Sequence, residues 1–281
     1  MAELKYGITL PYGAARETAE LARAAEAAGW DGVFVGDAIW CHDPLIQLTA
    51  AAMVTSRIRL GTMVLAMPLR RPWHLASESL ALDHLSGGRL ILGLGTGATW
   101  MGWRSFPSEV MDTRARAEML DEAIDILTRM HQSEQFDYAG KHYPVKLSLM
   151  DTMHYPPPTL HKPRVPIWIP GVWPRMKSMR RVLKCDGLLP QKMSAEGKFE
   201  EVTPADVAEM AAYITANRTM ETPCDIVVEG KTAGLSAGEK QDKLAQWVSA
   251  GITWWVESTW GMSKEEVQGL IEQGAPGVAD R

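Results

Sequence analysis

Short apolar runs alternate with stretches of helical periodicity along the 281-residue chain. Apolar residues that recur every three or four positions predict helices, and short apolar runs bounded by Gly or Pro predict buried strands. The first half contains strands at 6–10, 32–35, 58–65 and 90–94, and helices at 17–28, from Pro44 to about 55, from Pro72, and at 113–130. A strand followed by a helix, repeated in this way, is typical of a parallel sheet covered by helices.

The same alternation fills the second half. It contains strands at 166–170, 187–189, 225–229 and 252–256, and helices at 176–183, 204–216, 239–250 and 264–271. Together these make about eight strand–helix units, the number that closes a (β/α)₈ TIM barrel. The first four strands are almost entirely apolar, as in any parallel sheet covered on both faces. An open doubly wound sheet has the same pattern, but the count of units and the lack of a second domain favour the barrel.

A polar, Pro-rich stretch at 132–163 interrupts the alternation after the fourth unit. Residues 136–138 and 142–145 predict a hairpin within it, and Pro156, Pro157 and Pro158 predict an extended segment. No linker divides the chain. We therefore predict one α/β domain over residues 1–281, with an insertion at about 132–163.

Composition narrows the class of protein. Hydrophobic residues make up 46% of the chain and the net charge is −5, so no basic surplus indicates a nucleic-acid partner. The three cysteines are far apart and form no CxxC pair, which suggests neither a disulfide framework nor a metal site. Without a basic-apolar leader or an apolar run long enough to span a membrane, we expect a cytoplasmic protein that acts on a small molecule.

The active site of a (β/α)₈ barrel lies at the carboxyl ends of its strands. Five of the 11 tryptophans follow predicted strands, namely Trp40, Trp100, Trp103, Trp173 and Trp260. We predict that they line the mouth, where aromatic walls suit a planar cofactor or an apolar substrate. The alternative for each of them is a core or interface position.

Two polar residues after the second strand are candidate catalytic groups. Asp37 could accept a hydrogen bond from a ring or polarise a neighbour, and the alternative is a helix cap or turn former. His42 could contact the substrate or act as an acid, although His42-Asp43-Pro44 also fits an ordinary helix start.

Glycines mark other strand exits. The run from Gly93 to Ala98 fits GxGxxA, the loosest form of the dinucleotide-binding fingerprint, but no helix follows it directly. We prefer a glycine-lined exit where the backbone approaches a flat ligand. Gly171 and Gly187 could hold a phosphate through backbone amides or could be plain turn glycines.

The block from Asp43 to Gly97, "DPLIQLTAAAMVTSRIRLGTMVLAMPLRRPWHLASESLALDHLSGGRLILGLGTG", closely resembles the bacterial luciferase-like superfamily. The segments "AAEAAGWDGVFVGD", "PRVPIWIPGVWP" and "CDGLLP" match in order and spacing. The resemblance covers most of the chain to about residue 190. It implies a (β/α)₈ barrel that uses a flavin such as FMN, or coenzyme F420, and it favours a homodimer.

The resemblance also implies roles for individual residues. A non-proline cis peptide that backs the cofactor ring would fall at Met63–Val64, and Asp37 would lie close to that ring. Thr96 and Gly97 match contacts to the ring edge, with Ala98 directly after them. Gly171, Val172 and Gly187 match loops on the phosphate side of the cofactor.

At three places the sequence departs from the pattern of the superfamily, and these departures limit the roles that the resemblance implies. Many F420-dependent dehydrogenases of this superfamily have His where this chain has Ala38 and Glu where it has Ala98. A Gly-Gly-Ser-like phosphate loop is replaced by Pro170-Gly171-Val172-Trp173. The first two changes remove the acid–base pair used in sugar-phosphate oxidation, and the third leaves FMN and F420 both open.

The leading hypothesis is therefore an oxidoreductase that transfers hydride or activates O₂ through reduced F420 or FMN, acting on a small apolar or aromatic substrate. Two alternatives remain. One is a non-catalytic flavin-binding protein. The other is an NAD-dependent Rossmann dehydrogenase, which predicts an open sheet and would be eliminated by a closed barrel.

Overall fold

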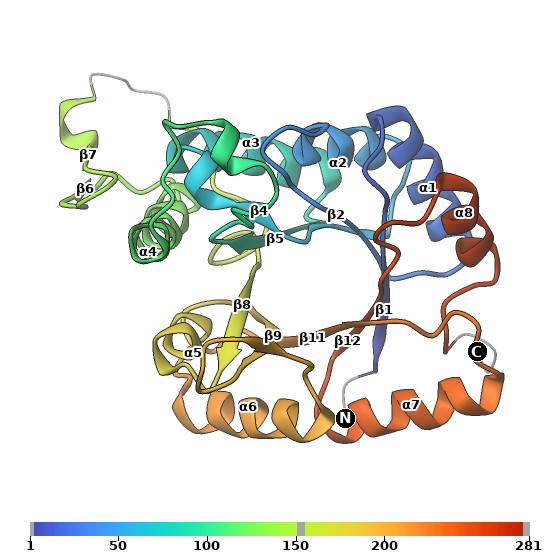
Figure 1. The fold of residues 1–281 in the computed structure, drawn as a ribbon. Coiled ribbons are helices and arrows are strands. Elements are labelled where there is room, and N and C mark those ends of the chain that lie inside the picture. The colour runs from blue at the N-terminus through green and yellow to red at the C-terminus, as the bar shows by residue number, and fades with distance from the viewer. Residues whose placement is uncertain (1–2, 151–154, 278–281) are drawn as a thin grey trace.

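The computed structural model describes residues 3–150 and 155–277. Eight parallel strands form a barrel in which each strand pairs with the next, and the last strand, β12, pairs with β1 to close it (Figure 1). They are β1 (Lys5–Thr9), β2 (Gly32–Val35), β3 (Arg59–Thr62), β5 (Leu90–Gly95), β8 (Ile167–Trp173), β9 (Gly187–Met193), β11 (Asp225–Gly230) and β12 (Trp254–Glu257). The predicted (β/α)₈ barrel is confirmed, and the open sheet required by the Rossmann alternative is not present among the described strands.

A helix follows each barrel strand and packs outside it (Figure 1). The helices are α1 (Ala15–Ala27), α2 (Pro44–Ala52), α3 (Pro72–Ser86), α4 (Thr113–His131), α5 (Met176–Val182), α6 (Pro204–Asn217), α7 (Ala237–Ser249) and α8 (Lys264–Glu272). Capping residues explain several starts. Thr203, Ser236 and Ser263 each form a capping box with an acidic residue three positions later, which satisfies free amides of the first turn.

The third predicted strand, 58–65, is broken in the structure. β3 ends at Thr62, the peptide between Met63 and Val64 is cis, and the chain resumes as β4 (Leu65–Ala66) and a 3₁₀ turn at Met67–Leu69. The expected position of the cis peptide is thus confirmed. It lies at the carboxyl end of β3, at the mouth of the barrel.

Strands β8 and β9 run three and four residues further than predicted. Pro170 and Pro190 indicated strand ends, but the two strands stay paired beyond them, up to Trp173 opposite Lys192. Proline removes only one donor from a ladder, so a strand can continue through it where that donor is not needed. Gly171, Val172 and Gln191 therefore lie in strands and not in loops.

The stretch that we predict to be an insertion follows α4. Its hairpin is β6 (Asp137–Tyr138) paired antiparallel with β7 (Val145–Lys146), and Figure 1 shows it beyond α4, away from the barrel. Residues 151–154 of the predicted insertion lie outside the described part of the chain.

Two apolar cores hold the barrel together. The larger lies between the strands and the helices. The smaller fills the barrel lumen with Phe34, Ile91, Trp168, Val227, Trp254 and Val256. Phe34 stacks on Trp168 at 5.2 Å and meets Trp254 edge-on at 5.9 Å between ring centroids. Three aromatic rings thus close the lumen beneath the mouth, in the manner of a packed TIM barrel.

A buried histidine couples α3 and α4 and predicts a pH effect on stability. Nε2 of His131 lies 2.8 Å from Oγ of Ser79, and burial lowers the pKa of His131 from 6.5 to about 4. The imidazole of His131 binds a proton below about pH 6.5 in the unfolded chain, but only below about pH 4 in the folded chain. The free energy of unfolding should therefore fall by about 3 kcal/mol as the pH falls through that window.

Urea titrations at several pH values would measure this loss. His131→Phe should flatten the profile between about pH 6.5 and about pH 4, whereas the exposed His74→Phe should leave it as in the wild type. Identical slopes for His131→Phe and the wild type would contradict the assignment.

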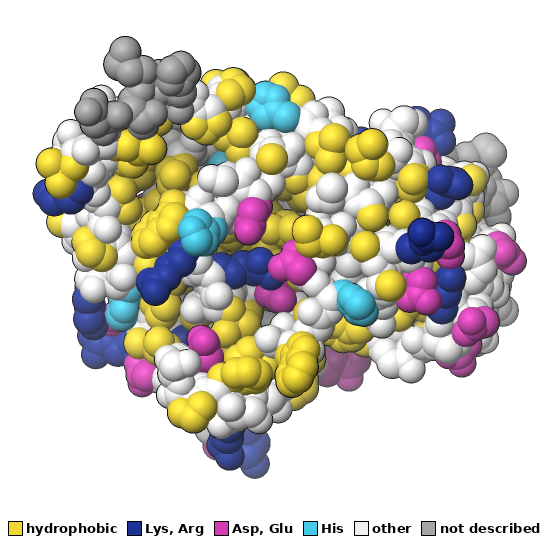
Figure 2. All heavy atoms as spheres, turned by 90° about the horizontal axis from the view of Figure 1, so that it is seen from above, with side chains coloured by type: hydrophobic (Ala, Val, Ile, Leu, Met, Phe, Trp, Pro, Cys, Tyr) yellow, Lys and Arg dark blue, Asp and Glu magenta, His cyan; other side chains and the backbone are white. Residues whose placement is uncertain are grey.

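On the face shown in Figure 2, Lys and Arg side chains alternate with Asp and Glu and form no continuous basic patch. None of the helices in the described ranges combines the length and the hydropathy needed to cross a bilayer.

Candidate active site

The glycines that end β5 make room for the segment after β3. A Cβ atom at Gly93 would lie closer than 3.0 Å to the backbone oxygen of Thr62, and one at Gly95 would lie 2.7 Å from Val64. The hydroxyl of Thr62 in turn donates to the carbonyl of Gly93 (2.9 Å). These glycines therefore admit the protein's own backbone. Our prediction that they admit a flat ligand is wrong for Gly93 and Gly95.

A buried arginine fixes the exit of β5. The guanidinium of Arg116, on α4, donates to the carbonyls of Thr96 (2.8 Å) and Gly97 (3.0 Å) and stacks over Trp103 (5.4 Å). Trp103 is 1% exposed, and its ring fills the space beside Gly97, where φ is +79°. Trp103 therefore supports this turn and does not line a substrate pocket as predicted. Ala98, which follows Gly97, is half-buried.

Asp37 is buried at the exit of β2. Its Oδ2 accepts a hydrogen bond from the amide of Ala66 (3.0 Å), and its Oδ1 lies 3.6 Å from Arg70. Only 4% of the side chain is exposed. Burial raises the pKa of this carboxyl, and the charge of Arg70 opposes that rise. Asp37 thus holds the β4 segment that follows the cis peptide.

Arg70 joins two carboxylates. The same guanidinium nitrogen that approaches Asp37 lies 3.0 Å from Asp43, and Asp43 caps α2 by accepting from the amides of Leu45 and Ile46. Sequence reasoning missed Arg70. The available signal was its position after the third predicted strand, next to the exit of the second, which carries both Asp37 and Asp43.

The other residues predicted after β2 lie at the surface. His42 is exposed and uses its backbone carbonyl to accept from Gln47 (2.9 Å). Trp40 is 88% exposed and Trp100 is 84% exposed, each on a loop after a barrel strand. Trp260 is half-buried and packs on Tyr12 (5.8 Å) above Gly36, so it does lie at the mouth.

Gly171 and Val172, which we predict in a loop on the phosphate side of the cofactor, lie in strand β8 and contact the protein itself. A Cβ at Gly171 would meet Leu188 and α5, and the amide of Val172 donates to Oγ of Ser178 in α5 (3.0 Å). Trp173 turns to α6, where Nε1 donates to Glu209 (2.9 Å).

Gly187 begins β9, so it lies at the amino end of the barrel, opposite the mouth. A Cβ there would collide with the indole of Trp168. Packing, and not a phosphate, therefore accounts for Gly187.

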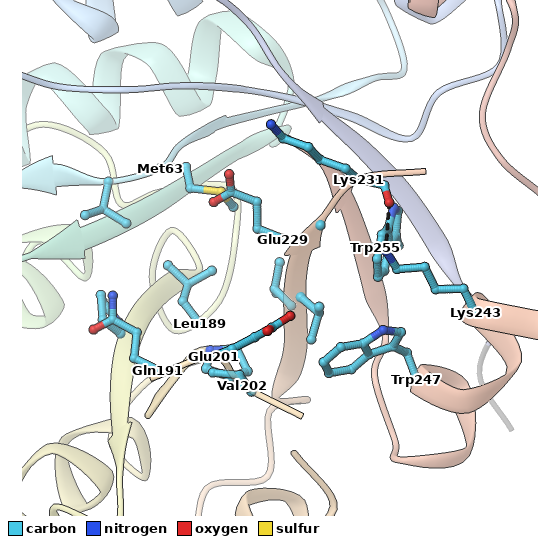
Figure 3. Close-up of a pocket in the computed structure, with 16 residues that line it drawn as sticks. Met63, Leu189, Gln191, Glu201, Val202, Glu229, Lys231, Lys243, Trp247 and Trp255 are labelled. Atoms are coloured by element: carbon cyan, nitrogen blue, oxygen red, sulfur yellow. Dashed lines mark hydrogen bonds between the residues drawn. The ribbon is translucent and has the colours of Figure 1, made fainter. Parts of the chain in front are cut away.

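A cavity of about 530 Å³ opens beside the cis peptide. Figure 3 shows it between β9 and β11, with Met63 at one end and Trp247 and Lys243 of α7 at the other. Its inner end is formed by Met63, Val64, Pro170, Leu189, Gln191 and Val227. Met63 and Leu189 also pack on the lumen core. The size lies within the range of small-molecule sites, about 300–1,000 Å³.

Of the sequence-predicted site residues, Met63 and Val64 line this cavity. Most of its wall comes from β9, β11, α7 and the segment before α6 that contains Glu201 and Val202, where the sequence carries no distinctive motif. The available signal was two short segments that place polar residues at the ends of apolar runs, Gln191-Lys192 and Glu229-Gly230-Lys231.

Within the described ranges, no three His, Cys, Asp or Glu side chains gather closely enough to hold a metal ion.

Comparison with known proteins decides the family. The sequence model of the luciferase-like monooxygenases matches residues 4–265, nearly the whole chain. The chain belongs to the luciferase-like monooxygenase family. One relative in the family is a Mycobacterium tuberculosis protein assigned as a coenzyme F420-dependent oxidoreductase. It is 36% identical over 203 residues, which are 67% of this chain and 56% of that relative. The match therefore spans little more than half of the relative's length.

Solved structures share the fold. A coenzyme F420-dependent tetrahydromethanopterin reductase from Methanopyrus kandleri superposes with a TM-score of 0.71 at 18% identity, over 98% of this chain and 99% of that one. The oxygenating constituent of a Pseudomonas putida diketocamphane monooxygenase, solved with FMN, gives a TM-score of 0.61 at 19% identity. This match covers 87% of this chain and 72% of that one.

Proposed function

We propose that this protein is an oxidoreductase that binds reduced F420 or FMN in the cavity beside Met63–Val64. The observation that carries the proposal is the cavity itself, which opens directly onto the cis peptide at the mouth. Family membership supports it, as do the F420-dependent assignment of the mycobacterial relative and the FMN bound to the diketocamphane enzyme.

The cavity fits a flat ring system. Met63, Val64, Leu189 and Val227 offer an apolar surface, and the amide of Gln191 and the carboxylate of Glu229 offer polar atoms at its edge (Figure 3). Pockets of this kind combine apolar walls with a few polar groups that fix orientation. Met63 and Val64 would contact the ring, and Gln191 and Glu229 would bond its polar edge.

When bound, the cofactor supplies the hydride or activates O₂, and the protein supplies orientation and electrostatics. In this chain, Asp37 and Arg70 are positioning residues, because they hold the backbone after the cis peptide through Ala66. Arg116 plays the same part for Thr96 and Gly97. The exposed Trp40 and Trp100 offer aromatic faces to an apolar substrate at the mouth.

Parallel titrations with FMN and F420 test the proposal. We expect one of them to bind at micromolar concentration, with quenching of its fluorescence, and the bound reduced form to lose its electrons to an organic acceptor or to O₂. Binding of neither cofactor would refute the proposal. Binding without turnover would favour a non-catalytic flavin-binding protein, an alternative that Ala38 and Ala98 keep open.

We also propose that the protein is a homodimer and lies in the cytoplasm. Ile46 in α2 and Met53 directly after it are 63% and 68% exposed, so both apolar side chains are available to a partner. The free thiols of Cys41, Cys185 and Cys224 suit a reducing compartment. Light scattering should give twice the mass of the chain, and the charged variant Ile46→Glu should give the mass of one chain.

A further inference from the structure

The wall of the barrel opens between β9 and β11. These strands pair only at Gly187 with Asp225 and at Leu188 with Ile226. On one edge β9 stays paired with β8 up to Lys192. On the other edge, the short strand β10 (Phe199–Glu200) pairs with Lys192 and Met193. Residues 189–191 therefore face β11 across a gap that no described strand fills.

The cavity passes through this gap. Val227 of β11 belongs to the lumen core, whereas Val228 and Trp255 belong to the core between strands and helices. All three line the same cavity, so it extends from the mouth to the outer layer. We call the part outside the wall, lined by Val202, Val228, Lys243, Trp247 and Trp255, the outer arm.

The outer arm is apolar and aromatic. Two lysines line the cavity: Lys243 lies in the outer arm, whereas the side chain of Lys231 extends towards Met63 (Figure 3). The rings of Trp247 and Trp255 lie 6.3 Å apart. The Nζ atom of Lys243 lies 5.7 Å over the ring of Trp255 and donates to the backbone carbonyl of Lys231 (2.8 Å; Figure 3). Among residues 3–150 and 155–277, no carboxylate lies within ion-pair distance of Lys243. This ammonium group can therefore still pair with an anion.

Two carboxylates also line the cavity but do not neutralise Lys243. Glu229 accepts from Oγ of Ser258 (2.6 Å) and points towards Met63, at the inner end (Figure 3). Glu201 is exposed to solvent, which screens its charge.

We propose that the outer arm binds the tail of an elongated substrate, an apolar or arylalkyl chain that ends in a carboxylate held by Lys243. The reacting end of the same molecule lies at the mouth, so this inference rests on the proposed function. The aromatic walls supply the area that an apolar chain buries, and a charge-assisted hydrogen bond from Lys243 selects the acid over its neutral analogues.

Calorimetry with 6-phenylhexanoate and its neutral analogue 6-phenylhexanamide tests the inference. Lys243→Gln removes the cation, and Lys240→Gln, three residues earlier on α7 and outside the cavity, is its matched control. Val202→Trp fills the outer arm without touching the inner end. Circular dichroism and thermal unfolding verify that each variant is folded, and FMN and F420 titrations report on the inner end.

We expect the wild type and Lys240→Gln to bind the carboxylate about 10-fold more tightly than the amide. Lys243→Gln should lose this preference, and Val202→Trp should weaken both probes about 10-fold or more while FMN or F420 binds as in the wild type. No binding of the carboxylate to the wild type, or an unchanged preference in Lys243→Gln, would overturn the inference. Loss of cofactor binding with the acid preference intact would instead count against the proposed function alone.

Discussion

Replacing Gly93 with alanine is expected to lower the free energy of unfolding by about 3 kcal/mol. The added methyl group would lie closer than 3.0 Å to the backbone oxygen of Thr62, which cannot rotate away as a side chain can. Relief requires β3 and β5 to separate, at a point where Leu60 and Gly61 pair with Leu90 and Ile91. Because Met63 and Val64 directly follow Thr62, the same shift would displace them, and cofactor binding should be lost even where the variant still folds.

Urea denaturation followed by circular dichroism measures this effect. Gly269→Ala is the matched control, because Gly269 lies within α8 and nothing lies within 4 Å of its would-be Cβ. Alanine there should stabilise the protein by about 0.5–1 kcal/mol. A Gly93→Ala protein as stable as the wild type would mean that the β3–β5 approach is not as close as the structure shows.

Removal of the Arg70 side chain is expected to destabilise the protein by about 3 kcal/mol, because it leaves the buried carboxylate of Asp37 without its cation. The side chain of Asp37 is 4% exposed and cannot regain water without movement of the β4 segment. FMN or F420 affinity should fall with stability, since Asp37 holds Ala66, three residues after the cis peptide begins. Thermal unfolding and cofactor titration of Arg70→Ala measure both effects.

The pH dependence of Arg70→Ala identifies the cause. Burial already raises the pKa of Asp37, and loss of Arg70 raises it further. Between the ordinary pKa and the raised pKa, the folded variant binds a proton that the unfolded chain does not. Its stability is therefore highest below the ordinary pKa and is lost as the pH rises through the raised one. The deficit relative to wild type should be smaller at about pH 5 than at about pH 8.

Two further variants serve as controls for Arg70. Asp37→Asn in the Arg70→Ala background should recover part of the lost stability, because no buried charge remains. Arg114→Ala removes an exposed partner of Glu118 and should change little, as is usual for surface ion pairs. A deficit that is independent of pH and is not relieved by Asp37→Asn would show that Arg70 acts through packing alone.

The barrel could be predicted because the helix starts, the apolar runs and the number of strand–helix units all indicate it. Prolines at 44, 72 and 204 start helices where they were expected, and apolar runs such as Val33–Val35 are buried on both faces. The errors fall where tertiary contacts override local preference. Pro170 and Pro190 lie inside strands because β8 and β9 continue to pair there.

The site was predicted less well, for a physical reason. Local sequence located Met63–Val64 through the resemblance, but it could not show what fills each space. Gly93 and Gly187 face Thr62 and Trp168, residues distant in sequence, and not a ligand. Likewise, Trp103 is buried under Arg116 of α4, a contact that depends on how the helix packs. The cavity itself arises from the divergence of β9 and β11, which no motif records.

The central claim is that the cofactor ring lies against Met63–Val64, at the inner end of the cavity between β9 and β11. The most direct measurement is a crystal structure of the protein with FMN or F420 bound. The account predicts the ring in van der Waals contact with the Met63–Val64 peptide, with Gln191 or Glu229 at its polar edge. A ring bound outside this cavity, or contact with the Gly187 region at the opposite end of the barrel, would contradict it.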